Sequence, residues 1–124
     1  MSLLPAADLE GFLARFDADA AAVALAAREA VLQVFPDALE TADGKDLGYG
    51  TSAGYRGLVF VISPKRRAVN LGVARGASLP DPDGLMSGTG KVHRHVDLRS
   101  TEAAEDPALH RLMERALARH RSGG

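Results

Sequence analysis

The fold of this chain is decided by the stretch GLVFVISPKRRAVNLGVAR, residues 57–75. Residues 57–63 are β-branched or otherwise apolar almost without interruption, which is typical of a strand in the centre of a sheet. The basic turn at residues 64–67 leads into residues 68–75, where apolar side chains alternate with polar or small ones. This pattern predicts a β-hairpin, because successive residues of a strand face opposite sides of a sheet. The second strand then carries Val69, Leu71 and Val73 on one face and Asn70, Gly72 and Ala74 on the other.

Further strands are predicted on both sides of this hairpin. Residues 39–42 and 46–49 read as short strands around a glycine turn, and residues 92–99 as the last strand. The segment before the last strand contains Pro80 and Pro82, which cannot donate hydrogen bonds to a neighbouring strand. We therefore expect an antiparallel sheet of four to six strands, with a rigid loop before the last one.

Helical periodicity is confined to the two ends of the chain. A short amphipathic helix is predicted from the apolar stripe of Leu9, Phe12, Leu13 and Phe16. A second helix is expected over residues 18–34, because the residue before Pro36 disfavours the helical conformation. Asp106 caps a C-terminal helix that has Pro107 in its favoured first position.

The second helix carries apolar side chains on two sides. One face bears Val23, Ala27, Ala30, Val31 and Val34, and the opposite side bears Leu25 and Leu32. We expect this helix to pack on the sheet and also against the first helix. Helices segregated from strands indicate an α+β fold, a single domain of residues 1–124 with helices mainly on one face of the sheet.

Composition narrows the classes of partner. The 124 residues carry a formal net charge of −1, which argues against nucleic-acid binding through bulk electrostatics. The absence of cysteine removes disulfides, thiolate metal sites and cysteine nucleophiles. No signal peptide or membrane-spanning pattern is evident, so a cytoplasmic location without membrane contact is expected.

A glycine-rich turn at residues 88–91 suggests anion binding. Glycine amides can form a concave anion site, to which Lys91 would add charge. The turn is not a nucleotide-binding P-loop, because Gly84 and Gly90 are separated by five residues and Val92 stands where Ser or Thr is required. A non-nucleotide anion site and a plain flexible turn are the two readings that remain.

Two histidines alternate along the predicted last strand. His93 and His95 would project from one face, about 6.6 Å apart along the strand. Such a pair can ligate zinc or iron where a third ligand converges. Asp97 continues the row but cannot close a compact site by itself, and Asp81, Asp83 and Glu40 are the candidates for a supporting acid. The alternative is a pair of ordinary histidines, one of them hydrogen-bonded within the sheet.

Arg94 and Asn70 need partners. Arg94 falls on the same side as Val96 and Leu98, so its charge requires a carboxylate or a ligand. A buried Asn70 amide would likewise have to be hydrogen-bonded. No Ser-His-Asp arrangement or other complete catalytic motif is present, which favours a non-enzymatic function.

The segment from Asn70 to Leu98 resembles the YdhG-like family of small bacterial proteins of unknown function. The resemblance is carried by the motifs VNLG (69–72), RGASLPDP (75–82), GTGK (88–91) and RHV (94–96), with YG (49–50) and SPK (63–65) upstream. The family pattern maps onto Asn70, Gly72, Arg75, Gly76, Leu79, Pro80, Gly88, Gly90, Lys91, Arg94 and His95. The chain departs from it at His93, where an apolar residue is usual, and at Asp97, where a basic one is usual. Tyr49-Gly50 stands where more distant relatives have a tryptophan-containing segment.

What this resemblance implies is a compact α+β domain. Because a member of the wider family has been proposed as a frataxin-like iron chaperone, it also implies a role in iron handling.

The leading functional hypothesis is a non-enzymatic domain that binds a small anionic molecule. The ligand-binding residues are expected to be Tyr49, Asn70, Arg75, Gly88, Gly90, Lys91, Arg94 and His95. The first alternative is iron or zinc binding through His93 and His95. A second alternative is a structural domain whose exposed sheet pairs with another copy to form a homodimer.

Overall fold

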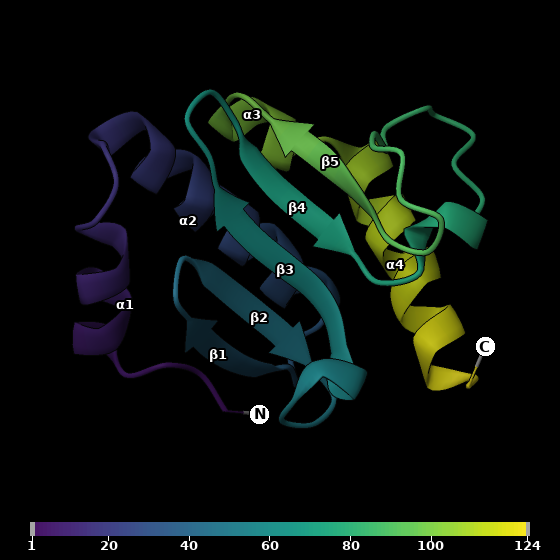
Figure 1. Cartoon of the computed structure of the whole chain (residues 1–124), viewed down its shortest axis with the longest axis horizontal. Helices are drawn as coiled ribbons and strands as arrows, with labels where there is room; N and C mark the ends of the chain where they lie inside the picture. Colours follow the sequence, from purple (N-terminus) through teal and green to yellow (C-terminus); the bar gives the residue numbers. More distant parts are fainter. Residues whose placement is uncertain (1, 124) are drawn as a thin grey trace.

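The computed structural model describes residues 2–123 and has an α+β fold, as predicted (Figure 1). Two helices come first, five strands follow, and helices end the chain. The helices are α1 (Ala6–Leu13), α2 (Ala18–Val34), α3 (Thr101–Ala104) and α4 (Pro107–Arg121). The strands are β1 (Leu39–Asp43), β2 (Asp46–Gly50), β3 (Leu58–Pro64), β4 (Val69–Val73) and β5 (Arg94–Leu98). Two short 3-10 helices, η1 (Tyr55–Gly57) and η2 (Gly76–Ser78), flank the β3–β4 hairpin.

The five strands form one antiparallel sheet in the order β1-β2-β3-β4-β5. The strand predicted as central, β3, lies in the middle. Leu71 of β4 is opposite Ile62 of β3 and Val96 of β5, and all three side chains are buried. The alternation predicted for residues 68–75 is confirmed, and the structure shows that the face with Val69, Leu71 and Val73 is the one that meets the core.

The core lies between the sheet and the helices behind it (Figure 1). Helix α2 packs on β3 and β4, and α4 packs on β3. The side chains of Val31 on α2 and of Leu112 and Met113 on α4 are fully buried against this face. The opposite face of the sheet, which we call the open face, carries half-buried residues such as Val61, Asn70 and Gly72.

Local signals account for the ends of the two long helices. Helix α2 has the predicted bounds; the Asp17 carboxylate accepts a hydrogen bond from the backbone N–H of Ala20 at its start. Asp106 caps α4 in the same way, with Pro107 in the first helical position. None of the helices within residues 2–123 is long and apolar enough to cross a lipid bilayer.

Two local expectations were wrong. Leu25 on α2 is 40% exposed and Leu32 is half-buried against the core, so the second apolar side of this helix is covered only in part. Strand β5 begins at Arg94, two residues later than predicted, and Val92 is 52% exposed. The backbone of Val92 instead accepts a hydrogen bond from the Ala77 N–H of η2, which draws this segment away from the sheet.

Both outer strands of the sheet carry one additional bridge. Ser2 pairs with Leu39 of β1 in parallel orientation, and Ser87 pairs with His95 of β5 in antiparallel orientation. The backbone of Ser87 and His95 exchanges two hydrogen bonds, of 2.7 and 3.2 Å. Segments from outside the sheet thus cover part of each edge.

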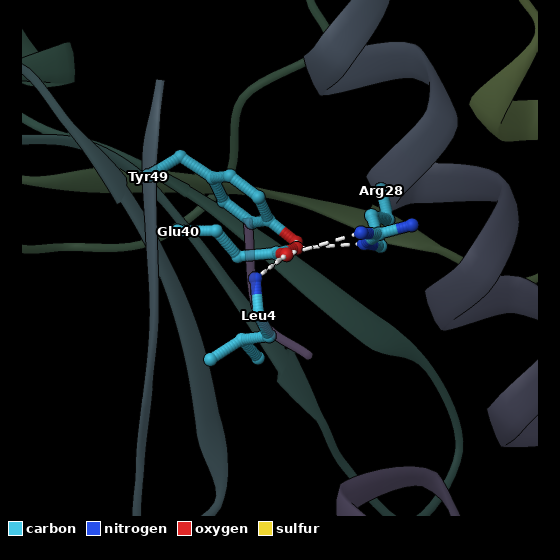
Figure 2. A network of polar contacts seen from close by, with 4 residues as sticks. All are labelled: Leu4, Arg28, Glu40 and Tyr49. Carbon is cyan, nitrogen blue, oxygen red and sulfur yellow. Dashed lines mark hydrogen bonds and ion pairs between the residues drawn. The ribbon is translucent and has the colours of Figure 1, made fainter. Parts of the chain in front are cut away.

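A buried carboxylate ties the N-terminal segment to α2 and to the sheet (Figure 2). Glu40 of β1 is 3% exposed and accepts four hydrogen bonds. Arg28 donates two of these from Nε (2.7 Å) and Nη2 (3.0 Å), the Tyr49 hydroxyl donates one (2.6 Å), and the Leu4 backbone N–H donates one (2.9 Å). The charge of Glu40 is therefore paired and its oxygens are satisfied, as burial of a carboxylate requires.

This network makes stability depend on pH. Burial alone would raise the pKa of Glu40, but the hydrogen bonds from Arg28, Tyr49 and Leu4 outweigh it and hold the pKa below the ordinary value of 4.5. A depressed folded-state pKa contributes stability that is complete above the unfolded value and is lost as the pH falls through the folded one. We expect the stability advantage of the native chain over Glu40→Gln, measured by urea denaturation, to be constant near neutral pH and to shrink below about pH 4.5. An advantage that persists in acid would contradict this assignment.

Candidate functional site

A groove of about 430 Å³ opens at the end of the sheet where β3 begins and β4 ends. Its apolar wall consists of Leu58, Val59, Val61, Gly72, Val73 and Ala74. Its polar rim consists of Tyr55, Arg56, Arg75, His93, Arg94 and His120. The volume lies within the usual range for small-molecule sites, and a mostly apolar lining with a few polar groups is typical of them.

The rim of the groove is cationic. Arg56, Arg75 and Arg94 line it, and no acidic side chain does. Within the described part of the chain no carboxylate lies within 4.0 Å of these three guanidinium groups, whereas Arg28, Arg111 and Arg121 all have one. Burial together with the nearby charge of Arg75 lowers the pKa of Arg119, which lies beside the groove. The positive charge gathered here is therefore uncompensated by the protein itself.

Backbone contacts fix the position of Arg75. Its φ of 54° and ψ of 30° place it in the left-handed region, uncommon for a residue with a side chain. Its N–H donates to Nδ1 of His93 (2.9 Å), and its carbonyl accepts from Nη2 of Arg119 (2.5 Å). These two hydrogen bonds, one with the segment before β5 and one with α4, therefore offset the conformational free-energy cost of the left-handed backbone.

Tyr55 and His93 form the second fixed part of the rim. The Tyr55 hydroxyl lies 2.7 Å from Nε2 of His93, and the two rings meet edge to face with centroids 6.0 Å apart. Because Nδ1 of His93 accepts from Arg75, the hydrogen of the neutral imidazole is on Nε2 and points to the tyrosine oxygen. The Tyr55 side chain is otherwise open to solvent, with 73% of its surface exposed.

A tight loop presents Tyr55. Gly54 has a φ of 93°, and the Thr51 N–H donates to the Gly57 carbonyl (3.0 Å), which closes the loop onto the end of β2. A Cβ on Gly57 would lie 2.5 Å from the Ser52 carbonyl oxygen and 2.8 Å from its nitrogen. Only glycine fits there, since these obstacles are backbone atoms.

The structure brings part of the expected site together. Arg75 and Arg94 both line the groove, and His93 joins them. Arg94 also donates a hydrogen bond from Nη1 to the Gly90 carbonyl and so links the rim to the glycine-rich turn.

The other expected residues lie outside the groove lining. Lys91, Gly88 and Gly90 are exposed on the turn, and Tyr49 is fully buried in the core beneath the sheet. Asn70 and His95 lie on the open face, where His95 contacts Asp97 at 3.2 Å.

No metal-binding geometry is formed around the two histidines. Among residues 2–123, no three His, Asp or Glu side chains gather closely enough to hold a metal ion. Both ring nitrogens of His93 are engaged by Tyr55 and Arg75, and Nε2 of His95 faces Asp97. The expectation that both histidines share one strand was wrong, because β5 begins only at Arg94.

Three rim residues were not predicted from the sequence: Tyr55, Arg56 and His120. His120 could have been predicted from the sequence, because it follows Ala116 and Leu117 of the buried α4 stripe at helical spacing. Tyr55 and Arg56 come directly after a glycine-bounded loop and follow no periodic pattern. Only the folded loop shows that they line the same groove as Arg75.

Comparison of the chain with protein-family models, with curated proteins and with solved structures finds no match. Membership of the YdhG-like family therefore stays a prediction.

Proposed function

We propose that this protein binds a small anionic molecule in the groove and does not transform it. The proposal is carried by one observation: three arginines line an apolar cavity that contains no acidic residue, in a chain whose net charge is −1. Guanidinium groups recognise carboxylates and phosphates through paired hydrogen bonds. An anion would supply the negative charge that this rim lacks.

The composition of the lining supports binding over catalysis. Acyl or phosphoryl transfer needs a nucleophile beside a base, or a carboxylate that moves a proton. No Ser, Thr, Asp or Glu is among the residues that line this groove. The imidazole of His93 is held between Tyr55 and the Arg75 backbone, which leaves it with a positioning role.

The test uses calorimetric titration with 2-naphthoate, octanoate and inorganic phosphate. At least one of these anions should bind, and each of Arg56→Gln and Arg75→Gln should weaken it about tenfold, because each removes a charged hydrogen-bond donor. Binding should also weaken with added salt.

Arg66→Gln and Arg67→Gln provide the matched control. Both arginines are exposed, and they lie in the β3–β4 turn at the other end of the hairpin. Their removal changes the net charge equally and should leave binding unchanged. The proposal fails if none of the three anions binds, or if both pairs of variants weaken binding to the same extent.

A further inference from the structure

Gly72 is not explained by the fold. It lies inside β4, where glycine is disfavoured relative to β-branched residues. A Cβ built on Gly72 would meet only Val61, its backbone oxygen at 3.5 Å and its Cβ at 3.6 Å, which are ordinary van der Waals contacts. The backbone of β4 would therefore accept a larger residue here.

The strand glycines of β2 behave differently. A Cβ on Gly48 would lie 2.7 Å from Cδ2 of Leu58, and one on Gly50 would lie 2.6 Å from the Gly57 carbonyl oxygen. The space above Gly48 is filled by the protein itself. The space above Gly72 is part of the groove, so the absence of a side chain at Gly72 leaves room there for another molecule.

The surface next to Gly72 is apolar on its β3 side, and His95 of β5 lies opposite Gly72 on the other side. Val61 lies directly opposite Gly72 in the register of β3 and β4, and Leu58 and Ala74 also line this part of the groove. The exposed ring of Tyr55 also lines the groove. A planar ring fits such a surface, because it can lie on the bare backbone of Gly72 and make aromatic contact with Tyr55.

The rim supplies a matching head-group site. Since Nε2 of His93 donates to the Tyr55 oxygen, the Tyr55 hydroxyl hydrogen is free to donate to a ligand. Arg75 and Arg94 line the same groove with no carboxylate partner within the described residues. One neutral and two charged donors suit the two oxygens of a carboxylate.

We infer that the ligand is a planar aromatic carboxylate, with its ring on Gly72 and its carboxylate at Tyr55, Arg75 and Arg94. The inference rests on the proposed function and goes beyond it by naming the ligand class. Inorganic phosphate would use the rim alone and leave the apolar wall exposed. An alkyl carboxylate would use the wall without aromatic contact to Tyr55.

Titration of the full chain tests this with 2-naphthoate as the probe and octanoate and inorganic phosphate as comparators. We expect 2-naphthoate to bind on the order of tenfold more tightly than octanoate, and phosphate to bind most weakly. Gly72→Val should weaken 2-naphthoate by at least about tenfold, because its side chain enters the space above the strand. Tyr55→Phe should weaken it by about threefold to tenfold through loss of one hydrogen bond.

Asn70→Val is the matched control, since Asn70 lies two residues away on the same open face of β4 and does not line the groove. Circular dichroism and the melting temperature establish that each variant folds. If Gly72→Val does not fold, Gly72→Ala replaces it, with a smaller expected loss of 2-naphthoate affinity. Equal or tighter binding of octanoate overturns the inference, as does unchanged 2-naphthoate affinity in the Gly72 variant. If phosphate alone binds and depends on Arg75, the proposed function stands and this inference fails; if no anion binds, both fail.

Discussion

Alanine in place of Glu40 is expected to lower the free energy of unfolding by about 3–5 kcal/mol, because it removes one partner of a buried ion pair. The substitution leaves the Arg28 guanidinium, whose side chain is only 18% exposed, without its carboxylate. It also leaves the buried Tyr49 hydroxyl and the Leu4 N–H without their acceptor. Urea denaturation followed by circular dichroism measures the loss.

Asp37→Ala is the control for this prediction. Asp37 pairs with Arg121 at 3.0 Å, but both side chains are at least half exposed. Exposed pairs of this kind contribute about 0–1 kcal/mol. If Glu40→Ala costs no more than Asp37→Ala, then the Glu40 network does not hold the N-terminal segment and α2 to the sheet in the way described.

Alanine in place of Gly57 is expected to cost about 1–3 kcal/mol of stability and to abolish binding of 2-naphthoate. The new Cβ would collide with backbone atoms of Ser52 and with its hydroxyl, so the loop that presents Tyr55 must move. Denaturation and calorimetric titration of the same preparation separate the two effects.

Gly11→Ala is the matched substitution in an open position. Gly11 is exposed within α1, and nothing lies within 4 Å of the Cβ that alanine would add. Alanine is favoured over glycine by about 1 kcal/mol inside a helix, so Gly11→Ala should stabilise the chain and leave binding unchanged. A Gly57→Ala variant that retains native stability and affinity would show that the 51–57 loop is not rigid.

The parts of the fold that could be predicted are those set by local chemistry. Helix α2 ends where Pro36 requires it, and the hairpin of β3 and β4 follows from alternation within one continuous stretch. The sequence predicts the start of β5 two residues too early, because Val92 has a high intrinsic preference for strands. In the structure the Val92 carbonyl instead accepts a hydrogen bond from the Ala77 N–H of η2. Helix α3 has only four residues and no periodicity to reveal it.

The candidate site was predicted only in part, because segments far apart in the chain come together to form it. Arg75 and Arg94 are predicted as ligand-binding residues because they are basic groups beside the glycine-rich loop, and both line the groove. Tyr55 and His120 come from segments far from them in the chain, and loop closure and helix packing bring them there. Tyr49 was expected at the site on sequence grounds, but strand alternation directs its side chain into the core.

The bridges at the two outer strands bear on how the protein behaves at high concentration. A sheet edge with free N–H and C=O groups is a template on which a strand of another molecule can add, and such addition starts many aggregates. Here Ser2 occupies part of the β1 edge, and Ser87 occupies part of the β5 edge. Both ends of the hydrogen-bonding ladder are thus partly closed by the chain's own backbone, which disfavours open-ended growth of the sheet from one copy to the next.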